Sequence, residues 1–111
     1  MRSIEEITKE LEQKITDFFV PLQTMQGVNL RKFESLEQCV VDATYALKGE
    51  ELLPRILLKE IDGVVKILTN EAPFCKTHDL REMAGRIQFL FHLILLGETP
   101  DDRQRGVPRI I

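Results

Sequence analysis

A chain of 111 residues is long enough for one domain with a hydrophobic core. Its content of 43% hydrophobic and 30% charged residues is ordinary for a globular protein and excludes a chain that is disordered as a whole. The net charge is −3 and is uneven, because residues 1–51 carry −4 and residues 52–111 carry +1. An acidic N-terminal half argues against nucleic-acid binding, which needs a basic patch, and is compatible with a basic protein partner.

Four segments place apolar residues three and four positions apart, the spacing that keeps one side of a helix apolar. These segments cover about residues 3–20, 30–48, 52–69 and 79–96. The sequence therefore predicts a single all-α domain over residues 1–111. We expect a small antiparallel bundle of about four main helices, followed by an extended C-terminal tail over residues 98–111.

Local signals set the expected ends of the first two helices. Ser3 followed by Glu6 forms a capping box, which predicts the start of the first helix. Pro21 is expected to end that helix at about residue 19 or 20. Asn29 is the expected N-cap of the second helix, and Gly49 is expected to close it in the left-handed conformation.

The third helix is expected to begin before Pro54, which is tolerated in a first turn. Gly63 lies in the middle of this helix, and close packing against another helix is favoured over a hinge as its explanation. Thr77 or Asp79 is expected to cap the fourth helix, and Gly97 to end it.

The fourth helix is apolar on nearly every side from Phe89 to Leu96, and the third helix is similar around residues 52–58. So much apolar surface predicts a homodimer or a partner-binding face. The alternative is that the tail folds back as a strap, with Pro108 stiffening it and Val107, Ile110 and Ile111 as anchors.

Reactive side chains gather only at Cys75, His78 and Asp79. A zinc site needs about four ligands, and no paired spacing supplies them, so neither a metal, a cofactor nor a catalytic residue is predicted. Cys39 is expected to be buried and both cysteines to be free thiols. His92 is expected to be a hydrogen-bonded core histidine.

No secretory signal is visible at the N-terminus, and the stretch from residue 89 to residue 96 is far shorter than the ~20 residues of a membrane span. A cytoplasmic location with no membrane contact is the expectation. The carboxylates of Glu5, Glu6, Glu10 and Glu12 lie mostly off the apolar stripe, which predicts a solvated helix face rather than acid–base catalysis.

The end of the chain resembles the end of small bacterial immunity proteins, in particular those of contact-dependent growth inhibition systems. The resemblance rests on Gly97-Glu98-Thr99-Pro100-Asp101-Asp102 and Gly106-Val107-Pro108-Arg109-Ile110-Ile111. It implies a cytoplasmic inhibitor without cofactor that binds one cognate toxin domain, a nuclease, and blocks its active site or its substrate path. No binding residue follows from the resemblance itself.

The acidic N-terminal half predicts which side chains would meet a basic toxin and speed the encounter. These are the acidic residues of the first two helices: Glu5, Glu10, Glu12, Glu34, Glu37 and Asp42. The alternative function is a helical scaffold or regulatory protein that acts through protein contacts or homodimerisation. A small hydrolase would need a polar pocket with a perturbed group, and none is apparent.

Overall fold

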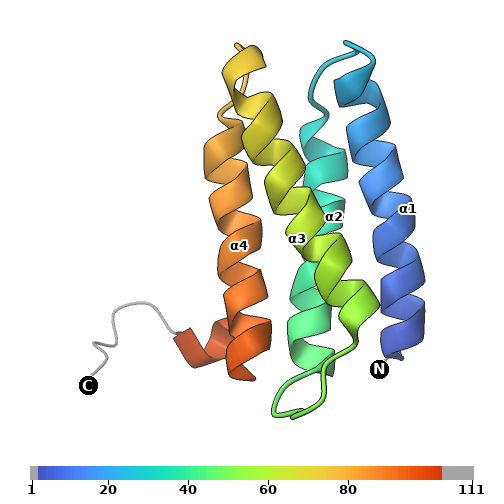
Figure 1. The fold of residues 1–111 in the computed structure, drawn as a ribbon, viewed down its shortest axis with the longest axis vertical. Helices are drawn as coiled ribbons and strands as arrows, with labels where there is room; N and C mark the ends of the chain where they lie inside the picture. Colours follow the sequence, from blue (N-terminus) through green and yellow to red (C-terminus); the bar gives the residue numbers. More distant parts are fainter. Residues whose placement is uncertain (1–2, 104–111) are drawn as a thin grey trace.

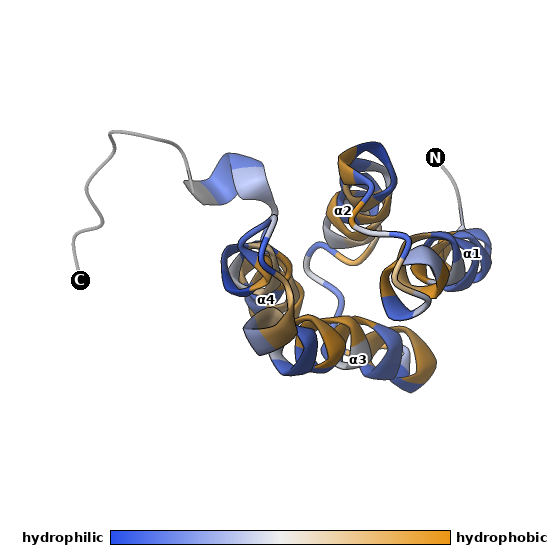
Figure 2. Ribbon diagram, turned by 90° about the horizontal axis from the view of Figure 1, so that it is seen from above, coloured by the Kyte–Doolittle hydropathy of each residue, from blue (hydrophilic) through white to orange (hydrophobic). Residues whose placement is uncertain are grey.

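Four helices in alternating directions form the molecule, which a computed structural model describes over residues 3–103 (Figure 1). They are α1 (Ile4–Gln23), α2 (Leu30–Ala46), α3 (Arg55–Glu71) and α4 (Leu80–Leu96), with the short 3-10 helices η1 (Ala72–Phe74) and η2 (Pro100–Arg103). The closest pairs are α1 with α2 and α3 with α4, and α2 also packs on α4 (Figure 2). The predicted all-α bundle is confirmed.

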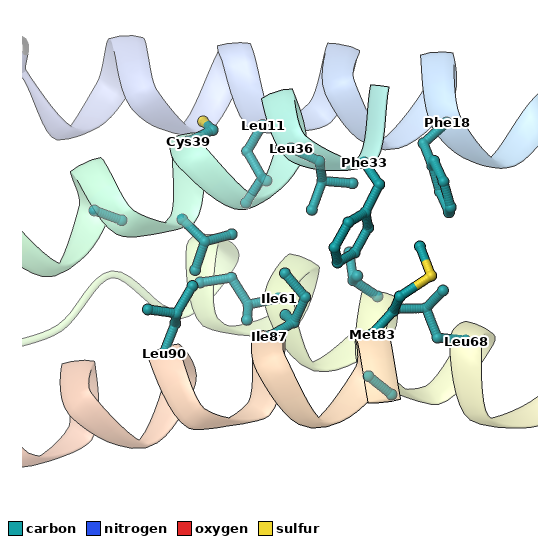
Figure 3. Close-up of a cluster of buried hydrophobic side chains, with 14 of the residues drawn as sticks. Leu11, Phe18, Phe33, Leu36, Cys39, Ile61, Leu68, Met83, Ile87 and Leu90 are labelled. Atoms are coloured by element: carbon teal, nitrogen blue, oxygen red, sulfur yellow. The ribbon is translucent and has the colours of Figure 1, made fainter. Parts of the chain in front are cut away.

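The core lies where the apolar stripes of the four helices meet (Figure 3). Leu11, Leu36, Ile61 and Ile87, one from each helix, are completely buried. Each such side chain stabilises the fold by about 1.5–3 kcal/mol through removal of its apolar surface from water. The stripes predicted from the sequence therefore form the interior, as their spacing indicated.

Three helices begin at the side-chain caps that the sequence indicated. The Oγ of Ser3 accepts from the backbone N–H of Glu6 at 3.2 Å and also donates to the Glu6 carboxylate at 3.1 Å. Asn29 caps α2 by accepting from the N–H of residue 32 at 3.2 Å. Asp79, rather than Thr77, caps α4 by accepting from the N–H of Glu82 at 3.1 Å.

The prediction that Pro21 ends the first helix is wrong, because α1 continues to Gln23 with the proline inside it. Proline disturbs only the carbonyl four residues earlier, so one further turn costs a single hydrogen bond at this helix end. Thr24 then closes the turn: its backbone N–H and its Oγ1 both donate to the carbonyl of Val20, at 3.0 and 2.7 Å.

The second and third helices are each displaced from their predicted ends. α2 stops at Ala46, and Gly49, with φ of 74°, lies in the turn that follows. α3 begins at Arg55 with Pro54 as its N-cap, three residues later than predicted. The reason is steric, since the residue before a proline avoids the helical conformation and Leu53 holds that position.

Close packing at Gly63 is also a wrong prediction. A Cβ added at this position would meet no atom of a neighbouring element within 4 Å. The glycine therefore faces open space on the outer side of α3, and its lack of a side chain serves no packing purpose that the structure shows.

Candidate functional site

The six acidic residues predicted to bind a partner are divided among different sides of the bundle. Glu5, Glu12 and Glu34 are exposed, whereas Glu10, Glu37 and Asp42 are half-buried. Residues two positions apart lie on nearly opposite flanks of a helix, so Glu10 and Glu12 point to different sides of α1. No single face carries all six.

Asp42 lies on the side of α2 that faces α1. The Sγ of Cys39 contacts the carbonyl oxygen of Ile7 at 3.5 Å, which identifies that side, and Asp42 is one turn further along it. Its carboxylate accepts from the side-chain amide of Gln38 at 3.0 Å. Asp42 is therefore part of a local polar network at the junction of the two helices.

Glu37 lies on the other side of α2 and ties that helix to α4. Its carboxylate accepts from both arms of the Arg86 guanidinium, with 2.9 Å between Nε and Oε2. The guanidinium also lies over the ring of Phe33, 5.1 Å from its centroid. The hydrogen bonds with Glu37 outweigh burial and raise the pKa of Arg86, helped by the charges of Glu82 and Glu34.

Three carboxylates thus surround one cation where α2 and α4 meet. Glu34 and Glu37 come from α2, and Glu82 comes from α4, where it lies 3.9 Å from the Arg86 guanidinium. Reasoning from the charge balance of the sequence missed Glu82, because it belongs to the half of the chain that carries +1. The sequence shows that Glu82 and Arg86 are four positions apart and can pair on one helix, but it does not show that both lie next to α2.

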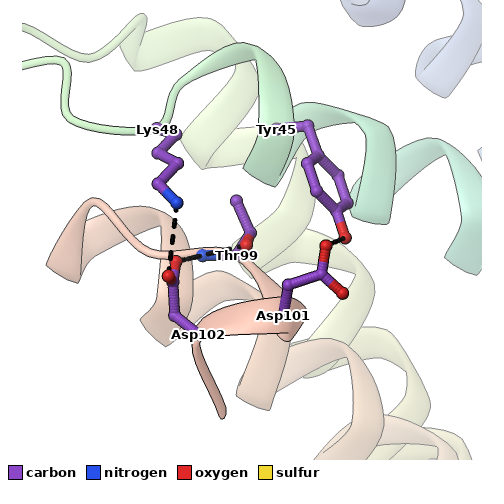
Figure 4. A network of polar contacts seen from close by, with 5 residues as sticks. All are labelled: Tyr45, Lys48, Thr99, Asp101 and Asp102. Atoms are coloured by element: carbon purple, nitrogen blue, oxygen red, sulfur yellow. Dashed lines mark hydrogen bonds and ion pairs between the residues drawn. The ribbon is translucent and has the colours of Figure 1, made fainter. Parts of the chain in front are cut away.

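The 3-10 helix η2 adds two more carboxylates near Tyr45, at the C-terminal end of α2 (Figure 4). The phenol of Tyr45 donates to the Asp101 carboxylate at 2.7 Å, and Lys48 pairs with Asp102 at 3.2 Å. Asp102 also accepts from the backbone N–H of Thr99 at 2.8 Å, and Thr99 is buried. These contacts hold residues 99–102 against the bundle.

The prediction of an extended tail from residue 98 is therefore wrong for its first part, because Pro100–Arg103 forms a helical turn that α2 anchors. The cause is a set of contacts between residues more than 50 positions apart, which sequence periodicity does not report. The proposed anchors of the strap, at positions 107, 108, 110 and 111, lie outside the described residues.

These contacts have opposite effects on the acidities of the groups involved. The hydrogen bond to Asp101 is the main cause that raises the pKa of Tyr45. The backbone hydrogen bond from Thr99, followed by the one from Lys48, lowers the pKa of Asp102.

We call the surface formed by these residues the α2/α4 face. It consists of Glu34, Glu37 and Tyr45 from α2, Lys48 from the turn after α2, Glu82, Arg86, Phe89 and Leu96 from α4, and Asp101 and Asp102 from η2. On α4, positions 82, 86, 89 and 96 follow steps of three, four and seven and so share one side of the helix. The face combines carboxylates near Arg86 with apolar side chains nearer η2.

The apolar half of the α2/α4 face is well exposed to solvent. Phe89 and Leu96 keep 48% and 59% of their surface, and Tyr45 keeps 39%. Next to them on α4, a shallow hollow is lined by Phe89, His92, Leu93, Leu95 and Leu96. The predicted excess of apolar surface on this helix is thus present among the described residues.

His92 is exposed, so the prediction of a core histidine is wrong. The buried residues of α4 include Ile87, Leu90 and Ile94, and His92 falls between their steps on the outer side of the helix. Leu93, the next residue in the sequence, is buried, whereas Phe89, Leu95 and Leu96 on the same helix remain about half exposed.

Cys39 is buried and Cys75 half-buried, and both are free thiols. Burial alone would raise the pKa of Cys75, but hydrogen bonds from the backbone of His78 and from Thr77 outweigh burial and lower it. Across residues 3–103, no three His, Cys, Asp or Glu side chains gather in a way that could hold a metal ion.

Comparison of the chain with protein-family models, with curated proteins and with solved structures found no match. None of the helices between residues 3 and 103 is both long enough and apolar enough to cross a bilayer. What the chain does must therefore be inferred from its own surface.

Proposed function

We propose that this chain is a non-enzymatic immunity protein that binds and neutralises one basic toxin domain, a nuclease, in the bacterial cytoplasm. The observation that carries the proposal is the α2/α4 face, which combines the carboxylates of Glu34, Glu37 and Glu82 with the exposed aromatic side chains of Tyr45 and Phe89. The acidic N-terminal half and the resemblance of the chain's end to immunity proteins support the same function.

The carboxylates would act first on the encounter and then on the bound state. Glu34 and Glu82 are exposed, so their field reaches a basic surface through solvent and speeds association at low salt. Tyrosine and phenylalanine are enriched in protein interfaces, and Tyr45 and Phe89 would supply the apolar contact that slows dissociation.

Charge reversal on this face tests the proposal. We expect the double variant Glu34→Lys and Glu82→Lys to associate roughly tenfold more slowly at low salt with the basic nuclease domain that the chain is proposed to neutralise. The difference should shrink at high salt because of screening. Stopped-flow association rates at two ionic strengths measure both effects.

The matched control is Glu50→Lys with Glu51→Lys, which changes the net charge by the same amount in the exposed turn after α2. A second variant, Glu5→Lys with Glu12→Lys, tests the exposed carboxylates of α1. Equal slowing by all three would indicate a net-charge effect instead of a defined interface. Absence of any complex with the nuclease domain would contradict the immunity function itself.

The exposed apolar side chains of α4 also favour the alternative function, a scaffold or regulator that works through homodimerisation. Phe89, Leu95 and Leu96 are each about half exposed on one helix, as the surface of a dimer interface would be in the separated chain. A mass of twice the chain mass by light scattering, together with no binding to the nuclease domain, would favour this alternative.

A further inference from the structure

The apolar half of the α2/α4 face lacks a cover among the described residues. Phe89 and Leu96 are two turns apart on the same side of α4 and are each about half exposed, and with His92, Leu93 and Leu95 they line a shallow hollow. Exposed aromatic and leucine side chains that adjoin one another are typical of a contact surface.

The chain itself leaves the described structure at the edge of this surface. After α4 ends at Leu96, the backbone turns at Gly97, and the N–H of Glu98 donates to the carbonyl of Leu93 at 2.9 Å. Buried Thr99 and the bonds of η2 to Tyr45 and Lys48 then keep the turn beside α2 (Figure 4). The next eight residues, 104–111, start from this point.

These eight residues are longer than the stretch of α4 that separates the two apolar side chains. An extended chain covers up to roughly 3.3 Å per residue, so the segment spans up to about 26 Å. Phe89 and Leu96 are seven residues apart in a helix that rises about 1.5 Å per residue, which places them about 10 Å apart along α4. The extended segment is therefore more than twice as long as the stretch of α4 that it would cover.

The chemistry of the segment is complementary to the face. Residues 104–111 contain Arg105 and Arg109 and no acidic side chain, and three of the last five residues are apolar. The face offers the carboxylate of Asp101 at one end and those of Glu34 and Glu82 at the other. Opposite charge and apolar surface thus occur on both sides, and Pro108 reduces the conformational entropy lost on docking.

We propose that residues 104–111 dock on the apolar half of the α2/α4 face of the same chain and cover Phe89 and Leu96. A covalently tethered segment has an effective concentration in the millimolar range, so it needs little affinity to outcompete a second copy of the chain. The inference does not depend on the proposed immunity function, because it concerns the isolated protein.

Tryptic cleavage after Arg105 reports whether the segment is docked. A protease requires a free extended substrate, so docking slows cleavage of the bond between Arg105 and Gly106. We expect the double variant Phe89→Ser and Leu96→Ser to be cut there about tenfold faster than the unaltered chain, as measured by mass spectrometry over time.

The matched control is Leu52→Ser with Ile56→Ser, an apolar pair that is more exposed than Phe89 and Leu96 and lies around the start of α3. It should leave the cleavage rate unchanged. Circular dichroism of both variants identifies a general loss of folding. Docking in the unaltered chain would be supported directly by nuclear Overhauser effects between the Phe89 ring and the methyl groups of Ile110 and Ile111.

Equal cleavage rates in the unaltered chain and in the Phe89/Leu96 variant would overturn the proposal. Protection that grows with protein concentration, together with a mass of twice the chain mass, would overturn it in favour of a second copy on this face. Protection that appears only when the basic nuclease domain is added would overturn it in favour of that partner.

Discussion

At the scale of single residues, Tyr45 is the most informative side chain of this protein. It is the one tyrosine of the chain, which has no tryptophan, so its ionisation can be followed by absorbance without interference. It joins η2 to α2 through its hydrogen bond to Asp101, 56 positions away. The state of this phenol therefore reports whether the start of the predicted tail is held against the bundle.

The pKa of Tyr45 is raised above its ordinary value of 10.0, first by the hydrogen bond to Asp101. Because the folded state favours the protonated phenol, this contact stabilises the fold below pH 10 and is lost as pH rises through the folded pKa. Asp101→Asn should move the absorbance titration of Tyr45 to lower pH. An unchanged titration curve would show that the contact does not persist in solution.

At the scale of secondary-structure elements, the ends of the helices follow local chemistry only where a side-chain cap is present. Ser3, Asn29 and Asp79 begin their helices as predicted, because each cap bonds an N–H three residues away. Pro21 and Pro54 acted differently from the prediction. At Pro21 the extra turn loses a single hydrogen bond and is closed by Thr24, whereas Pro54 keeps the residue before it out of the helical conformation.

The interior of α3 offers a test at the same scale. Gly63→Ala should stabilise the protein by roughly 0.5–1 kcal/mol, since alanine is the better helix former and its Cβ would meet no neighbouring element. The free energy of unfolding in urea measures the gain. Gly97→Ala is the contrasting control. Gly97 has a φ of 72°, and a Cβ added there would lie 3.4 Å from the backbone N of Gly49, so we expect this variant to lose stability.

If Gly63→Ala lowered the stability instead, the outer side of α3 would have to contact something that residues 3–103 do not supply. The result would then indicate that a partner or a second copy of the chain packs closely against this glycine.

At the scale of the whole molecule, α2 and α4 are neighbours that run in the same direction, and their junction carries the candidate site (Figure 1). Glu37 and Arg86 are 49 positions apart in the sequence and join α2 to α4. Removal of either side chain therefore tests how strongly this pair holds the two helices together. The pair is partly solvent-exposed, which limits the energy it can contribute.

A double-mutant cycle with Glu37→Gln and Arg86→Met should give a coupling free energy of about 0.5–1.5 kcal/mol, since the bond is two-pronged but partly hydrated. The control is the Asp62–Lys66 pair, whose members are four residues apart on the solvent-exposed side of α3 and have an expected coupling of about 0.2–0.5 kcal/mol. Equal couplings for the two pairs would mean that Glu37 and Arg86 contribute no more than a surface pair.

The sequence by itself determined the helices and the core. The three-and-four spacing of apolar residues decides which side of each helix avoids water, and positions such as Leu11, Leu36 and Ile87 are buried as that spacing predicted. Side-chain caps act within three residues of the helix start, so they too follow from local sequence. The acidic balance of residues 1–51 is likewise a property of the sequence alone.

Only the tertiary structure decided which charged residues share a surface. Glu37 meets Arg86, and Tyr45 meets Asp101, because the bundle places α2 beside α4 and η2. The spacing of charged residues in the sequence indicates on which side of its own helix each residue lies, but not which other helices are next to it. The sequence therefore groups Glu5 and Glu12 with Glu34, although they lie on another side of the bundle. Contacts between distant segments depend on how the helices pack, and local spacing carries no information about that.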